Sequence, residues 1–284
     1  MAVHSILPLD LTAAVDEVLG AAGVPHIAHG DDDPVGAAEK AAADPQARAL
    51  IGPFRSADVN EALAATAPAR LPLLAPVATW VGITRDDEPD CDDAPEHDGT
   101  VFRLVARDIV VAQQIAERLQ GQRALVIAGD HDYGLQLNSQ LRMAGLTRAE
   151  PPEEADVIVL AGLVGEPEND RARELAPLPI VAFDGIQGET YPNQDVTIAL
   201  VYAPGPIGVS EARRAAEIVA TATDLDAIRA IGFDEHGDPL DPPVHFNRYS
   251  RSAVRAAQYP HMPCTPPPGG VEDEQRNTPG SGVE

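Results

Sequence analysis

Lysine is almost absent from this chain: Lys40 is its single lysine, and Lys+Arg total 20 against 45 Asp+Glu. The formal net charge of the 284 residues is therefore −25. Binding to nucleic acid or to an anionic membrane surface depends on clusters of Lys and Arg, and the arginines here are scattered. The charge balance argues against both kinds of partner.

Long apolar runs are lacking as well. Even the apolar stretch 155–165 is short and flanked by acidic residues, whereas a membrane-spanning helix needs about 20 apolar residues. We expect no membrane span. The first ten residues have no Lys or Arg ahead of their apolar run, so the charged start of a secretory signal is missing. We expect a cytoplasmic protein from the chain as written, and an extracytoplasmic one if its true start differs.

Cysteine is scarce and the common enzyme motifs are missing. Cys91 and Cys264 allow at most one intramolecular bridge and do not settle the compartment. The chain contains no GxSxG, GxxxxGK[ST], GxGxxG, HExxH or CxxC pattern. We predict no catalytic activity, no cofactor and no metal. Asp130, His131 and Asp132 could form the acid–base cluster of an enzyme. We favour a polar turn before a helix, which explains the same three residues.

Three further polar clusters have simpler explanations than a metal site. His26 and His29 lie on an expected strand, where a spacing of three directs the side chains to opposite faces. Residues 234–238 form a polar turn around Gly237. The run 84–98 holds eight carboxylates without the stagger and glycine of a calcium loop, so we interpret it as a solvated loop.

Short apolar runs alternate with alanine-rich helical patterns along the chain, which is typical of α/β proteins with mostly parallel sheets. Strands are expected at 3–7, 24–28, 49–52, 71–75, 101–105, 123–128, 157–160, 180–183 and 244–249. Helices are expected at 11–22, 34–43, 57–67, 109–120, 135–144, 169–175 and 209–222, with Asp108 as the cap of the fourth. The pattern predicts two similar α/β units in tandem.

Residues 260–284 are rich in Pro, Gly and Glu and are expected to form a disordered tail.

Several short motifs resemble one family when they are taken in order. They are Ile51-Gly52-Pro53 with Ser56, Leu71-Pro72-Leu73 with Thr79, Phe102-Arg103 with Asp108, Asp132-Tyr133-Gly134, Phe183-Asp184-Gly185, and Phe233-Asp234 with Gly237-Asp238. Together they resemble the type I periplasmic solute-binding family, specifically the branched-chain amino-acid (Leu/Ile/Val) binding proteins. The resemblance covers about residues 49–249 and implies two Rossmann-like α/β lobes that are joined by a hinge and close on a small ligand.

The resemblance also implies a division of the chain. Residues 1–105 would form lobe 1, with 200–230 returning to it. Residues 106–199 would form lobe 2, with 231–250 near the hinge or in lobe 2.

The resemblance also implies a ligand site. Ser56, at the start of a helix, would donate to the ligand carboxylate, although Ser56 as a plain helix cap is the alternative. Val77, through its backbone, and Thr79 would hold the α-groups. Tyr133 from the second lobe would cover the ligand, and Asp184 would pair with its α-ammonium group.

The chain departs from the family pattern in two ways. Residues 23–49 and 185–208 are shorter than usual. A tyrosine that the family has in the second lobe falls near residues 163–165, which include no aromatic residue. Aromatic residues make up only 4% of the chain, and Trp80 and Tyr191 are the candidates to supply the missing ring.

Two functions follow. The first is a binding protein for an amino acid or related amide, which serves an ABC transporter permease or acts as a ligand sensor with a signalling partner. The alternative is a cytoplasmic regulatory or interaction module that keeps the fold without the pocket.

Overall fold

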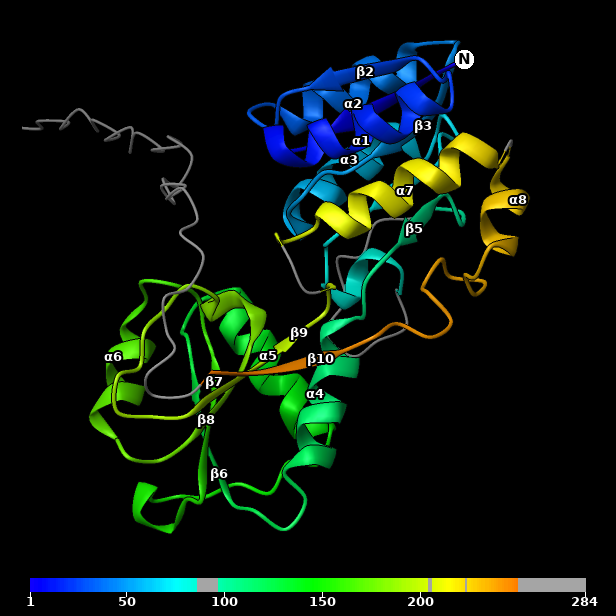
Figure 1. Ribbon diagram of the computed structural model, residues 1–284. Helices are drawn as coiled ribbons and strands as arrows, with labels where there is room; N and C mark the ends of the chain where they lie inside the picture. The colour runs from blue at the N-terminus through cyan, green and yellow to red at the C-terminus, as the bar shows by residue number, and fades with distance from the viewer. Residues whose placement is uncertain (86–96, 204–205, 223, 250–284) are drawn as a thin grey trace, which may run out of the picture.

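The computed structural model describes residues 1–85, 97–203, 206–222 and 224–249, which form two α/β lobes, each built on a five-stranded sheet (Figure 1). The expected α/β class, with two lobes and mostly parallel sheets, is confirmed. Most of the acidic run, both cysteines and the expected tail lie outside the described residues. Within the described residues, no helix is both long and apolar enough to cross a membrane.

Lobe 1 is a parallel sheet covered on both faces. Its strand order is β2-β1-β3-β4-β5, and the strands are β1 (Ala2–Ile6), β2 (His26–His29), β3 (Ala47–Ile51), β4 (Leu73–Ala75) and β5 (Val101–Arg103). Its helices are α1 (Leu9–Ala21), α2 (Pro34–Ala43), α3 (Ser56–Thr66), α7 (Val209–Thr221) and α8 (Leu225–Ala230).

Alternation along the strands explains the two layers of helices. Ile51 and Phe102 belong to a buried cluster with apolar side chains of α1 and α7, whereas Leu50 and Val101 belong to a second cluster with side chains of α2 and α3. Neighbouring strand residues point to opposite faces of a sheet. Because both faces are covered, β1 is buried along its whole length.

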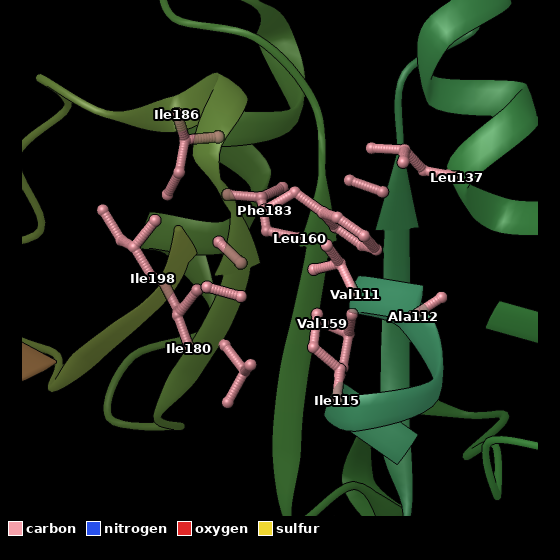
Figure 2. Packing of buried hydrophobic residues seen from close by; sticks show 14 of the residues in the cluster. Val111, Ala112, Ile115, Leu137, Val159, Leu160, Ile180, Phe183, Ile186 and Ile198 are labelled. Carbon is pink, nitrogen blue, oxygen red and sulfur yellow. The ribbon is translucent and has the colours of Figure 1, made fainter. Parts of the chain in front are cut away.

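Lobe 2 has the strand order β10-β9-β8-β7-β6. Its strands are β6 (Ala124–Ala128), β7 (Val157–Ala161), β8 (Ile180–Phe183), β9 (Val196–Leu200) and β10 (His245–Tyr249), and only β10 runs antiparallel to its neighbour. Its helices are α4 (Asp108–Arg118), α5 (Asp132–Met143) and α6 (Pro167–Glu174). Val111 and Ile115 of α4 and Leu137 of α5 share a core with Val159 of β7 and Phe183 of β8 (Figure 2).

The chain passes between the lobes three times, after β5, after β9 and after α8 (Figure 1). The segment 200–230 therefore supplies α7 and α8 to lobe 1, and β10 joins the sheet of lobe 2. Two elements were not expected from the sequence, namely β9 and α8. One-turn 3-10 helices lie at Val81–Ile83, Pro152–Glu154 and Asp184–Ile186.

Candidate functional site

Asp184 is the centre of the candidate site. It follows β8 directly, and its Oδ1 accepts a hydrogen bond from Tyr133 Oη at 3.3 Å while its Oδ2 accepts one from Tyr202 Oη at 2.6 Å. Burial raises the pKa of Asp184 more than these two tyrosine hydrogen bonds lower it. Gly185 makes the arrangement possible, because a Cβ at this position would lie 2.7 Å from Gly162 O and 3.1 Å from the ring of Tyr133.

A second buried carboxyl group belongs to Asp108, which is 1% exposed. Its Oδ2 has no hydrogen-bond partner among the described residues. Burial, and then the charge of Asp184, raise the pKa of Asp108 to about 7, against the opposing effects of the Thr79 hydroxyl and of Arg103. The expectation that Asp108 caps its helix was wrong by one position: Arg107 is the cap, and Asp108 is the first residue of α4.

The loop after β4 brings lobe 1 to this site. The main-chain N–H of Asp108 donates to Thr79 O at 3.0 Å, and Thr79 is itself buried. Val77 is buried in the core cluster of lobe 2, although it belongs to the loop of lobe 1. This loop therefore joins the lobes at the start of α4.

Ser56 lies at the edge of the same loop. It is the first residue of α3, after the cap Arg55, and its Oγ accepts a hydrogen bond from the Trp80 N–H at 3.3 Å. The first N–H groups of a helix lack intrahelical partners and favour an anion. The structure thus links Thr79 to Asp108, and Tyr133 to Asp184, and it places Ser56 beside the Thr79 loop; the ligand contacts of these residues and of Val77 stay a prediction.

The structure describes the surroundings of both candidate replacement rings, Tyr191 and Trp80. Tyr191 is 1% exposed and donates through its Oη to Asn169 Oδ1 at 2.6 Å, so it is a core residue. The Trp80 ring packs against Gly82 and the lobe 1 cluster of α2 and α3. The second tyrosine of the site is Tyr202, just after β9. Tyr202 was not predicted because β9 was not predicted, although the β-branched residues Val196, Thr197 and Ile198 are typical of a strand.

Asp238 holds a network at the hinge. It accepts hydrogen bonds from Thr84 Oγ1 at 2.6 Å and Arg85 Nε at 3.0 Å, and it pairs with Arg103 Nε at 3.1 Å and Arg107 Nε at 3.2 Å. Burial raises the pKa of Asp238, but the charges of Arg103 and Arg107 and the hydrogen bonds outweigh it, so the pKa is lowered overall. The turn expected at 234–238 is present, and it also ties the third crossing between the lobes to the first.

His131 caps α5 and does not form an acid–base cluster with its neighbours. Its Nδ1 accepts from the Gly134 N–H at 3.2 Å, and its ring stacks on that of Tyr133 with 6.4 Å between centroids. Asp132 is exposed at the start of α5. In the described residues, no carboxylate forms a hydrogen bond or ion pair with His131, which leaves the polar turn as the simpler interpretation.

The two histidines of β2 have separate partners, as their spacing predicts. His29 Nε2 lies 3.0 Å from His4 Nδ1, whereas His26 joins Ser5 Oγ at 2.8 Å and Asp16 Oδ1 at 2.5 Å. The Ser5–His26–Asp16 set has the order of a catalytic triad, but Ser5 is 0% exposed within β1, so a substrate has no access to its Oγ. No group of His, Cys, Asp and Glu side chains in the described ranges is arranged to hold a metal ion.

These features define a class of fold: two α/β lobes, crossed three times by the chain, with polar groups gathered where the lobes meet. This is the fold of the type I periplasmic binding proteins. Neither a protein-family model nor a curated protein matches this chain.

Solved structures match it over most of its length. An ABC transporter substrate-binding protein from Desulfitobacterium hafniense in complex with Leu is 19% identical, with a TM-score of 0.64 over 88% of this chain and 97% of that one. A branched-chain amino acid transporter substrate-binding protein from Streptococcus pneumoniae with isoleucine is 14% identical, with a TM-score of 0.66 over 90% and 98%. A solute-binding protein from Rhodopseudomonas palustris with p-hydroxybenzoic acid is 14% identical, with a TM-score of 0.56 over 82% and 84%. At these identities the similarity establishes the fold and not the ligand.

Proposed function

We propose that this chain is a binding protein for a small molecule that carries an ammonium group, an amino acid or a related compound, and that it has no catalytic activity. The ligand binds where the lobes meet, beside Asp108 and Asp184. In this role the chain is the substrate-binding component of an ABC transporter or a ligand sensor.

The observation that carries the proposal is the pair of buried carboxyl groups. Neither Asp108 nor Asp184 forms an ion pair with an Arg or Lys of the described residues. A buried carboxylate without a cation is unfavourable, because the interior solvates charge poorly. An ammonium group offers three N–H donors and one positive charge, which suits both carboxylates. A neutral or anionic ligand would leave them unmatched.

The lobe 1 side suits the other end of an amino acid. The first N–H groups of α3, beside Ser56, have no partners within the helix, and Asp184 with its tyrosines belongs to lobe 2. A zwitterion would therefore contact both lobes. The names of the similar structures, which include complexes with Leu and isoleucine, support the same ligand class. The alternative of a module without a pocket has no observation in its favour.

Thermal unfolding with a ligand panel tests the proposal. The panel contains L-leucine, L-isoleucine and other amino acids, the hydroxy acid analogue of leucine, short amides, and p-hydroxybenzoate. A ligand at 100 times its Kd stabilises by about 2.7 kcal/mol, which corresponds to a rise in Tm of roughly 5–10 °C for a protein of this size. We expect such a rise with ammonium-bearing compounds and none with the hydroxy acid.

Matched variants locate the site. Asp184→Asn removes the charge and should abolish the rise, whereas Asp132→Asn, an exposed carboxylate of the same lobe, should preserve it. A rise with p-hydroxybenzoate alone, or one that survives in Asp184→Asn, would overturn the proposal.

A further inference from the structure

The carboxyl group of Asp108 is almost wholly buried, and its Oδ2 accepts no hydrogen bond from the described residues. Asp184 is close enough for its charge to raise the pKa of Asp108, and Tyr133, which donates to Asp184, is subject to the charges of both carboxylates. Asp108 is tied to the loop of lobe 1 through Thr79 O, and Asp184 is held by Tyr133 and Tyr202 of lobe 2, so both carboxyl groups belong to the junction of the lobes.

The groups that face this pair do not neutralise it. Three are uncharged hydroxyls, from the loop after β4, from α5 and from the segment after β9; they are Thr79, Tyr133 and Tyr202. The two nearby cations are engaged elsewhere. Arg103 donates to Asp238 Oδ1, Ala78 O and Thr84 Oγ1, and Arg107 pairs with Asp238.

Two buried carboxyl groups whose charges act on each other, and neither of which forms an ion pair with an Arg or Lys of the described residues, cannot both ionise at low cost, and such pairs titrate as a unit. We infer that the ligand-free protein carries one proton on the Asp108–Asp184 pair, and that the ammonium group of the ligand replaces this proton, which is released to solvent. This inference rests on the proposed function. It adds that binding is coupled to proton release and that the ligand must keep its amine charged.

A pH dependence of affinity follows. At a pH below the titration of the pair, each binding event displaces a proton, so the affinity should rise about tenfold for each pH unit. Above this range both carboxylates are already ionised, and the affinity should level off. The pKa of about 7 for Asp108 places the change near neutral pH.

The first experiment needs no ligand. Infrared difference spectra between the wild-type protein and Asp108→Asn at pH 6 should show a carboxylic-acid C=O band that disappears at pH 8.5. A second difference spectrum, between the wild-type protein and Asp184→Asn, detects the proton if it lies on Asp184. If neither pair shows the band at pH 6, the inference fails regardless of what the protein binds.

The second experiment uses L-leucine, with n-butylammonium chloride as a bare cation and n-butanol as its uncharged control. Titration calorimetry at pH 6 in phosphate and in a buffer of larger ionisation enthalpy should report about one proton released for each L-leucine or n-butylammonium bound. Asp108→Asn should bind without this release and with an affinity that no longer rises with pH. Binding that leaves the acid band in place would overturn the exchange. If the band is present but neither L-leucine nor n-butylammonium binds, both the exchange of proton for ammonium and the proposed ligand class are wrong. Only the claim that the ligand-free protein holds one proton on the pair would then be supported.

Discussion

The hydroxyl of Tyr202 donates to Oδ2 of Asp184 at 2.6 Å and thereby joins the ends of two neighbouring strands, β9 and β8. Together with Tyr133 it gives each oxygen of this buried carboxyl group one hydroxyl donor, and hydrogen bonds from the main-chain N–H groups of Asp184 and Gly185 also favour its charged form.

Removal of this hydroxyl should weaken the fold measurably. We expect Tyr202→Phe to lower the free energy of unfolding by about 1–3 kcal/mol, because a buried carboxyl group loses a donor. Tyr249→Phe is the control, since the Tyr249 hydroxyl forms no hydrogen bond in the described part of the chain and the change should be near zero. Urea unfolding at pH 7 measures both, and equal effects would contradict the role of the bond.

Asp238 lies in a polar turn, but we expect its removal to lower the free energy of unfolding strongly. Asp238→Ala leaves Arg103, which is 0% exposed, without its anionic partner. Breaking a buried ion pair in this way costs about 3–5 kcal/mol. The neighbouring Glu235→Gln removes a side chain that is largely exposed and should change the free energy of unfolding by less than about 0.5 kcal/mol. A small effect of Asp238→Ala would show that the arginines find other partners.

Gln140 is a buried amide that the fold does not satisfy. It is 0% exposed on α5, and both its Nε2 and its Oε1 lack partners within the described ranges. An unsatisfied buried group costs about 1–3 kcal/mol, so Gln140→Leu should stabilise the protein by an amount of this order. Gln113→Leu, an exposed position on α4, should not. Chemical denaturation of the two variants decides the question, and destabilisation by Gln140→Leu would point to a bound water.

Two glycines in helices should respond to alanine in opposite ways. A Cβ at Gly134 would lie 2.6 Å from the backbone of Gly129, so Gly134→Ala should destabilise lobe 2 and displace the adjacent Tyr133. Gly20 in α1 has nothing within 4 Å of a Cβ. Gly20→Ala should therefore stabilise by about 0.5–1 kcal/mol through helix propensity. Thermal unfolding of both variants checks the signs.

His29 should make the fold sensitive to mild acid. Burial, and then the charges of His4, Lys40 and His26, lower the pKa of His29 below its ordinary value of 6.5. The unfolded chain then binds more protons than the folded one, so stability should fall as the pH decreases through about 6.5. His29→Gln should reduce this loss between pH 7.5 and pH 5, measured by denaturation midpoints. A loss as large in the variant as in the wild type would assign it to other groups.

The sequence predicted the fold well, because continuous apolar strands and amphipathic helices are local patterns. Ordered motifs singled out Tyr133 and Asp184, which the structure joins by a hydrogen bond. Asp108 was assigned as a helix cap, since an acidic residue before an apolar helix has the same pattern whether it caps the helix or faces a ligand. The contact between Arg103 and Asp238 spans 135 residues of sequence, and no local pattern reports such a pair.

The return of α7 to lobe 1 also shapes how this protein is made. Leu11, Val15 and Leu19 of α1 pack against α7, which the ribosome synthesises about 190 residues later. At 5–20 residues per second this interval lasts roughly 10–40 s. During that time the apolar face of α1 is exposed, because α7 has not yet been synthesised. We expect chaperones that bind nascent chains to recognise this face.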